Sequence, residues 1–79
     1  MARIRSLTPG NQKIRKAPSE VDCYYQVLAD KSGETILHLT TFGSDDRKSA
    51  KKSSQSLQLD AELAENLAQL LRETFDLRK

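Results

Sequence analysis

The sequence has no tryptophan, one cysteine and one histidine, and aromatic residues make up only 5% of its 79 positions. A single cysteine, Cys23, excludes an intrachain disulfide, and one cysteine with one histidine cannot supply the four ligands of a structural zinc site. No segment approaches the roughly 20 apolar residues that a membrane-spanning helix needs, and the basic N-terminus lacks the apolar run of a signal peptide. We therefore expect a protein with no membrane span, cofactor or metal, and its lone thiol fits a cytoplasmic location.

The chain is also short, and its length makes at most one domain. A domain of this size buries only about 60% of the surface that its unfolded chain exposes, so its stability is marginal without further support. Disulfides, metals and oligomerisation are the usual supports. Because the composition excludes the first two, we expect a homodimer.

Positive charge is concentrated in two segments, although the formal net charge is only +2. Residues 1–19 hold five basic side chains and no acidic one, and four more lie between Arg47 and Lys52, whereas residues 60–79 hold five acidic and three basic side chains. This asymmetry predicts a polyanionic partner on one side of the molecule, with solubility alone as the alternative. Pro9, Gly10 and Pro18 mark residues 1–19 as a flexible basic arm, in which Ile14 could form a short edge strand. Residues 20–79 then form a single β-β-β-α domain.

Alternating apolar and polar residues predict three strands, over residues 21–29, 35–42 and 54–59. Between the first two, Asp30 to Gly33 is typical of a hairpin turn in which Gly33 takes a positive φ. A helix follows, with Asp60 as its N-cap, and its apolar residues repeat with the 3.6-residue period. These are Leu63, Leu67, Leu70, Leu71 and Phe75. The sequence therefore predicts an α+β fold, a small antiparallel sheet of three to four strands followed by one C-terminal amphipathic helix.

A lone helix can cover only one face of such a sheet. We expect it to cover the face that carries Val21, Leu37 and Leu57, on which Cys23 is a small core residue. The opposite face is then free for a ligand or a second subunit. It carries Tyr24, Gln26, Ile36, His38, Thr40, Phe42, Ser56 and Gln58.

Catalytic chemistry is not expected from these residues. Cys23 and His38 are the only candidates for a nucleophile and its base, but the alternation puts them on opposite faces of the sheet. The adjacent Asp45 and Asp46 lack the glycine spacing of a calcium loop, and no glycine-rich phosphate loop occurs. We interpret the protein as a binding module and not as an enzyme.

Aromatic side chains on an open sheet face beside lysines suit single-stranded nucleic acid, because bases stack on the rings while lysines contact phosphates. The hypothesis assigns phosphate contacts to Lys51, Lys52, Lys48 and Arg47. It assigns base stacking to Tyr24, His38 and Phe42. Arg15 and Lys16 would add further contacts with the nucleic acid. Such a protein could be a transcription or replication accessory. The alternative is a protein–protein interaction module that uses the exposed sheet face or edge. In a further alternative, Tyr24, Ile36 and Phe42 form a dimer interface or a second small core.

The stretch from Thr35 to Phe75 resembles the single-stranded-DNA-binding domain of the transcriptional coactivator positive cofactor four and its small bacterial relatives. The shared layout begins with a strand that ends in an aromatic, Leu37-His38-Leu39-Thr40-Thr41-Phe42, and continues with a polar loop containing lysines. A strand ending in Leu57-Gln58-Leu59, an acidic cap at Asp60 and a single helix complete it. The resemblance implies a curved antiparallel sheet, a dimer packed through the helices, and single strands lying across the sheet. Within it, Lys51 and Lys52 match the family's basic loop and Phe42 its strand-end aromatic.

Overall fold

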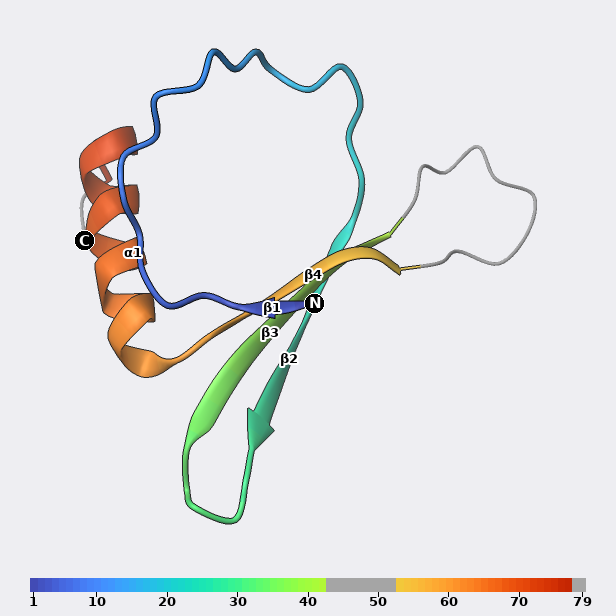
Figure 1. Ribbon diagram of the computed structural model, residues 1–79, viewed down its shortest axis with the longest axis vertical. Coiled ribbons are helices and arrows are strands. Elements are labelled where there is room, and N and C mark those ends of the chain that lie inside the picture. Colours follow the sequence, from blue (N-terminus) through green and yellow to red (C-terminus); the bar gives the residue numbers. More distant parts are fainter. Residues whose placement is uncertain (43–52, 78–79) are drawn as a thin grey trace.

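The computed structural model describes residues 1–42 and 53–77. Its elements follow the order β1 (Ala2–Arg3), β2 (Cys23–Ala29), β3 (Thr35–Phe42), β4 (Ser53–Leu59) and α1 (Ala61–Phe75). The strands form one sheet in the order β1-β4-β3-β2 (Figure 1). The α+β class and the single C-terminal helix are confirmed, and no helix among the described residues is long and apolar enough to cross a bilayer.

The sheet is mixed, because β2, β3 and β4 pair antiparallel while β1 pairs parallel with β4. Ala2 and Arg3 lie opposite Leu57 and Gln58, and the N–H of the following residue donates to the Gln58 carbonyl at 3.0 Å. The strand considered around Ile14 is wrong, since that part of the chain forms no strand. The N-terminus supplies the edge strand instead.

The turn between β2 and β3 is held by one carboxylate. Oδ1 of Asp30 accepts hydrogen bonds from the Ser32 hydroxyl (2.6 Å), the Ser32 N–H (3.0 Å) and the Glu34 N–H (3.1 Å). These bonds lower the pKa of Asp30 below its ordinary value of 3.8, and the bond from the Ser32 hydroxyl has the largest effect. Gly33 has a φ of 90°, in the left-handed region that glycine enters without steric cost. The predicted hairpin is confirmed.

A single residue, Asp60, separates the end of β4 from the start of α1. Its Oδ1 accepts a hydrogen bond from the Leu63 N–H at 2.9 Å, which confirms the predicted N-cap. The Arg3 guanidinium lies 3.4 Å from the other carboxylate oxygen of Asp60 and 2.5 Å from the Glu34 carboxylate. The Leu63 N–H, followed by Arg3, lowers the pKa of Asp60 below 3.8. This junction therefore joins β1, the hairpin and α1.

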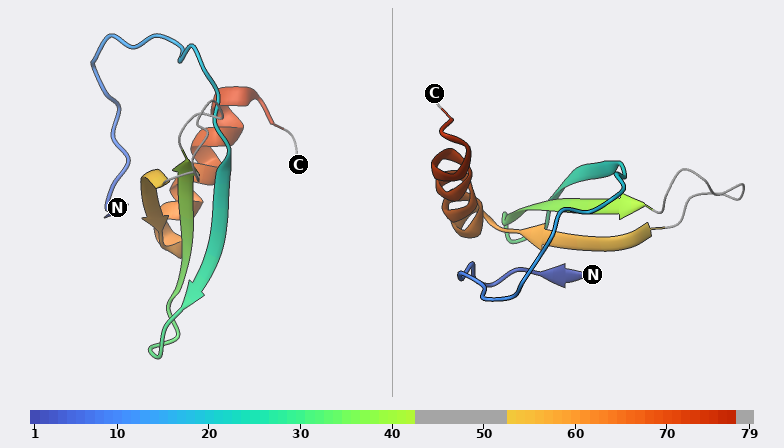
Figure 2. Two further views of the ribbon diagram at one scale, coloured as in Figure 1. Left: turned by 90° about the vertical axis from the view of Figure 1, so that its right-hand side faces the viewer. Right: turned by 90° about the horizontal axis from the view of Figure 1, so that it is seen from above.

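The helix covers neither face of the sheet, so the expectation that it covers Val21, Leu37 and Leu57 is wrong. In Figures 1 and 2, α1 stands at the end of the sheet where β4 stops instead of lying over a face. A helix that folds back over its preceding strand commonly needs a connection of about 2–6 residues. The one-residue connection at Asp60 is too short, and the helix therefore leaves the sheet at its end.

The most buried apolar side chains lie at the corner between sheet and helix. Ile36, Leu59 and Leu63 are 8%, 4% and 4% exposed. The sequence placed Ile36 on the open face, but it is buried because it is the second residue of β3 and lies beside the corner, where Leu37 pairs with Leu59. Cys23, the expected core residue, is exposed because it begins the edge strand β2 at the opposite end of the sheet.

Two substitutions of Asp60 distinguish the stability contributed by the helix N-cap from that contributed by the ion pair with Arg3. We expect Asp60→Ala to lower the Tm by roughly 5 °C, because the loss of a helix N-cap leaves backbone N–H groups without an acceptor. Asp60→Asn keeps an acceptor and removes only the exposed pair with Arg3, which contributes little, so its Tm should stay within about 2 °C of the unchanged protein. Thermal unfolding followed by circular dichroism measures both. Equal losses in the two variants would show that the charge matters and the cap does not.

Stability should also fall in acid. A carboxyl whose folded pKa is lowered contributes stability above its unfolded pKa, and this contribution disappears as the pH falls through the folded pKa. Asp30 and Asp60 both have lowered pKa values. We expect a urea midpoint that is steady down to about pH 5 and falls below about pH 4. The double variant Asp30→Asn with Asp60→Asn should show a smaller fall over the same range, and an unchanged fall would contradict the assignment.

Candidate nucleic-acid interface

The strand registers confirm which side chains share a face. On one side, called here the aliphatic face, Val27, Leu37 and Leu59 form one row, and Tyr25, Leu39 and Leu57 form the next. On the other side, called the polar face, one row consists of Gln26, His38 and Gln58, and the next of Tyr24, Thr40 and Ser56. The period-two pattern thus assigned these residues to the correct faces, although α1 covers neither.

The His38 ring is held by two neighbours on the polar face. The Gln58 amide Nε2 donates to Nδ1 of His38 at 3.0 Å, and Nε2 of His38 lies 2.7 Å from the Thr40 hydroxyl. An imidazole that accepts at Nδ1 carries its proton on Nε2, which can then donate to Thr40. The same Gln58 amide also lies 3.4 Å from the Met1 sulfur. His38 is therefore a half-buried and fixed ring, positioned by groups that the sequence analysis placed on this face without giving them a role.

The aromatic pair on this face is formed by Tyr24 and Phe42. Their ring centroids are 5.1 Å apart and the ring planes meet at 72°, an edge-to-face contact. Tyr24 is 56% exposed, whereas Phe42 is half-buried. Both residues were predicted to stack on bases, but they differ in exposure: Tyr24 has the accessible ring surface, and Phe42 packs against it.

The aromatic pair lies where two strands end. Phe42 is the last residue of β3 and Ser53 the first of β4, and the register between these strands shifts at Thr41 and Phe42. Residues 43–52 join the two ends. The predicted phosphate contacts Arg47, Lys48, Lys51 and Lys52 fall in this segment and lie outside the described residues.

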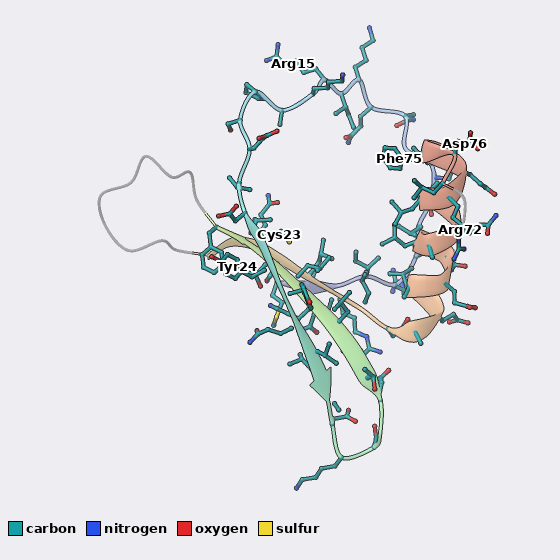
Figure 3. All side chains as sticks on the ribbon, turned by 180° about the vertical axis from the view of Figure 1, so that it is seen from behind. Arg15, Cys23, Tyr24, Arg72, Phe75 and Asp76 are labelled. Atoms are coloured by element: carbon teal, nitrogen blue, oxygen red, sulfur yellow. The ribbon has the colours of Figure 1, made fainter. Side chains whose placement is uncertain are left out.

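The basic residues of the arm are placed differently. Arg15 and Lys16 are exposed, and Figure 3 shows Arg15 on the arc of the arm, well away from Tyr24. The described structure therefore does not bring them to the aromatic pair. Arg3 of the same arm is engaged by Glu34 and Asp60 at the opposite end of the sheet.

The only thiol and the only imidazole of the sequence lie apart in the described structure. Cys23 pairs with Thr41 and His38 with Gln26, so the thiol and the imidazole lie on opposite faces, as the alternation predicted. Within residues 1–42 and 53–77, no group of three or more histidine, cysteine, aspartate or glutamate side chains could hold a metal ion.

Comparisons with protein-family models, with curated proteins and with solved structures gave no match.

The contact between Tyr24 and Phe42 can be measured with a double-mutant cycle. We expect Tyr24→Ala and Phe42→Ala to be coupled by about 0.5–1.5 kcal/mol in the free energy of unfolding, the usual range for an aromatic pair. The matched control is Tyr25→Ala with Phe42→Ala, because Tyr25 lies on the aliphatic face, and these two changes should be additive. Urea unfolding of the single and double variants provides the values. Additivity in the first cycle would mean that the ring contact carries no energy.

Proposed function

We propose that the protein binds single-stranded nucleic acid on the polar face and acts by binding, not by catalysis. Tyr24 stacks on a base, with Phe42 behind it, and His38 presents a fixed edge beside it. Lys51, Lys52, Lys48 and Arg47 neutralise phosphates, and Arg15 and Lys16 extend the grip. This is also the function implied by the resemblance to positive cofactor four, and it suits a transcription or replication accessory in the cytoplasm.

The position of the aromatic pair is the observation that carries this proposal. Tyr24 and Phe42 lie on a sheet face that no described helix covers, at the strand ends joined by the basic segment 43–52. Proteins that bind single strands without strong sequence preference combine such rings with a basic path for the backbone. A duplex would call for a helix or ribbon that fits the major groove. The acidic side chains of α1 disfavour that mode.

We also propose that the protein works as a homodimer. The chain exposes 7552 Å² of surface, whereas a compact monomer of its mass exposes about 4800 Å². Its radius of gyration is 15.2 Å, against about 12 Å for a compact domain of this length. The extended arm contributes to both differences, but β2 and α1 contribute as well through their exposed apolar side chains. An obligate dimer buries roughly 1000–2500 Å² from each subunit, so a second copy is large enough to cover these exposed apolar side chains.

The exposed apolar surface of α1 favours a second candidate function, docking of another protein. Leu70, Leu71 and Phe75 are 48%, 41% and 63% exposed, and Figure 3 shows Phe75 and Arg72 on opposite sides of the helix. An amphipathic helix with an open apolar side is a common protein-binding element. This candidate predicts a partner that binds regardless of salt and without need of the lysines.

A salt titration with a short single-stranded oligonucleotide tests the leading proposal. The logarithm of the binding constant should fall with the logarithm of salt by about 0.7 for each phosphate contact. Lys51→Ala with Lys52→Ala should reduce that slope by about 1.4 and weaken binding. Tyr24→Ala should weaken binding by about 5- to 150-fold, the equivalent of one lost stacked base, with little change in slope. Fluorescence anisotropy measures all three.

Lys31→Ala is the control, because Lys31 lies in the turn at the end of the sheet opposite Tyr24 and should leave affinity nearly unchanged. Circular dichroism confirms that each variant keeps its fold. Absence of binding at low salt, or affinity that ignores salt, would remove the proposal and favour docking of a protein partner.

A further inference from the structure

Strand β2 is an open edge of the sheet. It lies at the end of the strand order, and all seven of its residues are exposed. Its large side chains leave much apolar surface in water, because Tyr24, Tyr25, Val27 and Leu28 are 56%, 72%, 65% and 41% exposed. A strand of this kind offers unpaired backbone groups to any other strand.

Nothing in β2 discourages such pairing. Edge strands in monomeric proteins usually carry lysine, proline or a bulge that blocks a second strand. The sequence of β2, from Cys23 to Ala29, contains no charged residue and no proline, and its register with β3 runs without a break. The other edge of the sheet differs, since β1 covers the end of β4 and Arg3 is fixed there by two ion pairs.

The turn reveals which backbone groups of β2 point outwards. The Asp30 N–H donates to the Glu34 carbonyl at 3.2 Å, so these residues form a hydrogen-bonded pair. Such pairs alternate along an antiparallel ladder. The N–H and C=O groups of Ala29, Val27, Tyr25 and Cys23 therefore point away from β3.

We infer that β2 is an interface between two copies of this chain, in which the two β2 strands pair antiparallel about Gln26. In this register Cys23 lies opposite Ala29 of the second copy and Tyr25 opposite Val27. Every outward N–H and C=O of β2 then has a partner. Aromatic and β-branched residues are favourable cross-strand pairs, and Tyr25 with Val27 occurs twice.

A second copy fits this edge better than an open series of strands. Because β2 pairs with the β2 of the second copy, each copy uses the same edge of its sheet, so the contact is self-complementary and closes at two copies. The two sheets become one, with both polar faces on the same side. If the polar face binds nucleic acid as proposed above, one continuous surface would carry both Tyr24 side chains.

Disulfide trapping tests the register. In a Cys23→Ser background, Gln26→Cys puts two cysteines at the symmetry axis, where a pair without mutual hydrogen bonds has Cα atoms about 4.5 Å apart, close enough for a disulfide. Leu28→Cys is the matched control on the same face of the same strand. Its counterpart would lie about 14 Å away along the second strand. Under mild oxidation, we expect Gln26→Cys to form covalent dimer at least 10-fold faster than Leu28→Cys. Non-reducing gel electrophoresis measures both rates. Equal rates, or no dimer from either variant, would overturn the inference.

A second variant tests the interface without cysteine. Val27→Pro deletes an N–H that points away from β3, so it leaves the hairpin bonds intact while blocking the second strand. We expect at least a 10-fold weaker self-association by analytical ultracentrifugation, whereas Val27→Thr should change little. A dimer unaffected by Val27→Pro would place the contact elsewhere, for example on α1, and a chain that stays monomeric at high concentration would exclude any such dimer. Oligonucleotide binding is measured on the same variants, so that a failure of the dimer and a failure of nucleic-acid binding can be told apart.

Discussion

The whole arrangement depends on the one-residue connection between β4 and α1. Asp60 directly follows β4, caps the helix by accepting a hydrogen bond from the Leu63 N–H, and forms an ion pair with Arg3 near the N-terminus. One residue cannot act as N-cap and also reverse the chain, because a cap needs an extended backbone conformation, which Asp60 has (φ −94°, ψ −179°). The helix must therefore start where the strand points and leave the sheet at its end. Arg3 and Glu34 add a second attachment at the same corner.

This constraint explains why so little of the chain is buried. Among residues 1–42 and 53–77, the buried apolar side chains are Ile36, Leu59 and Leu63, at the corner where α1 leaves the end of the sheet. Elsewhere the aliphatic face, the β2 edge and the apolar side of α1 keep apolar groups in contact with water. Burying such surface is the main favourable contribution to folding, at about 25 cal/mol per Å². The one-residue connection at Asp60 thus leaves apolar surface exposed, and covering that surface is what the proposed dimer would achieve.

Local patterns in the sequence predicted what depends on neighbours along the chain. The hairpin at Asp30 and Gly33, the cap at Asp60 and the helix that follows are correct because their hydrogen bonds join residues two to four positions apart. The strand alternation also divided the side chains correctly between the two faces. The position of α1, the burial of Ile36 and the exposure of Cys23 depend on how elements meet in space. The parallel pairing of Ala2 and Arg3 joins residues that are over fifty positions apart, and no periodicity in a two-residue strand indicates it.

The two ends of the sheet therefore differ in structure. At the corner, ion pairs, the cap and the buried aliphatic residues fix β1, the hairpin and α1 together. At the other end the β3–β4 register shifts at Thr41 and Phe42, and such irregularities redirect side chains and often lie beside functional sites. Phe42 there supports the ring of Tyr24, and the neighbouring His38 is fixed by Thr40 and Gln58. For the proposed binding of single strands, rings that are held in place before the ligand arrives lower the entropy lost on binding, which is the advantage of a stacking surface on strands rather than on a loop.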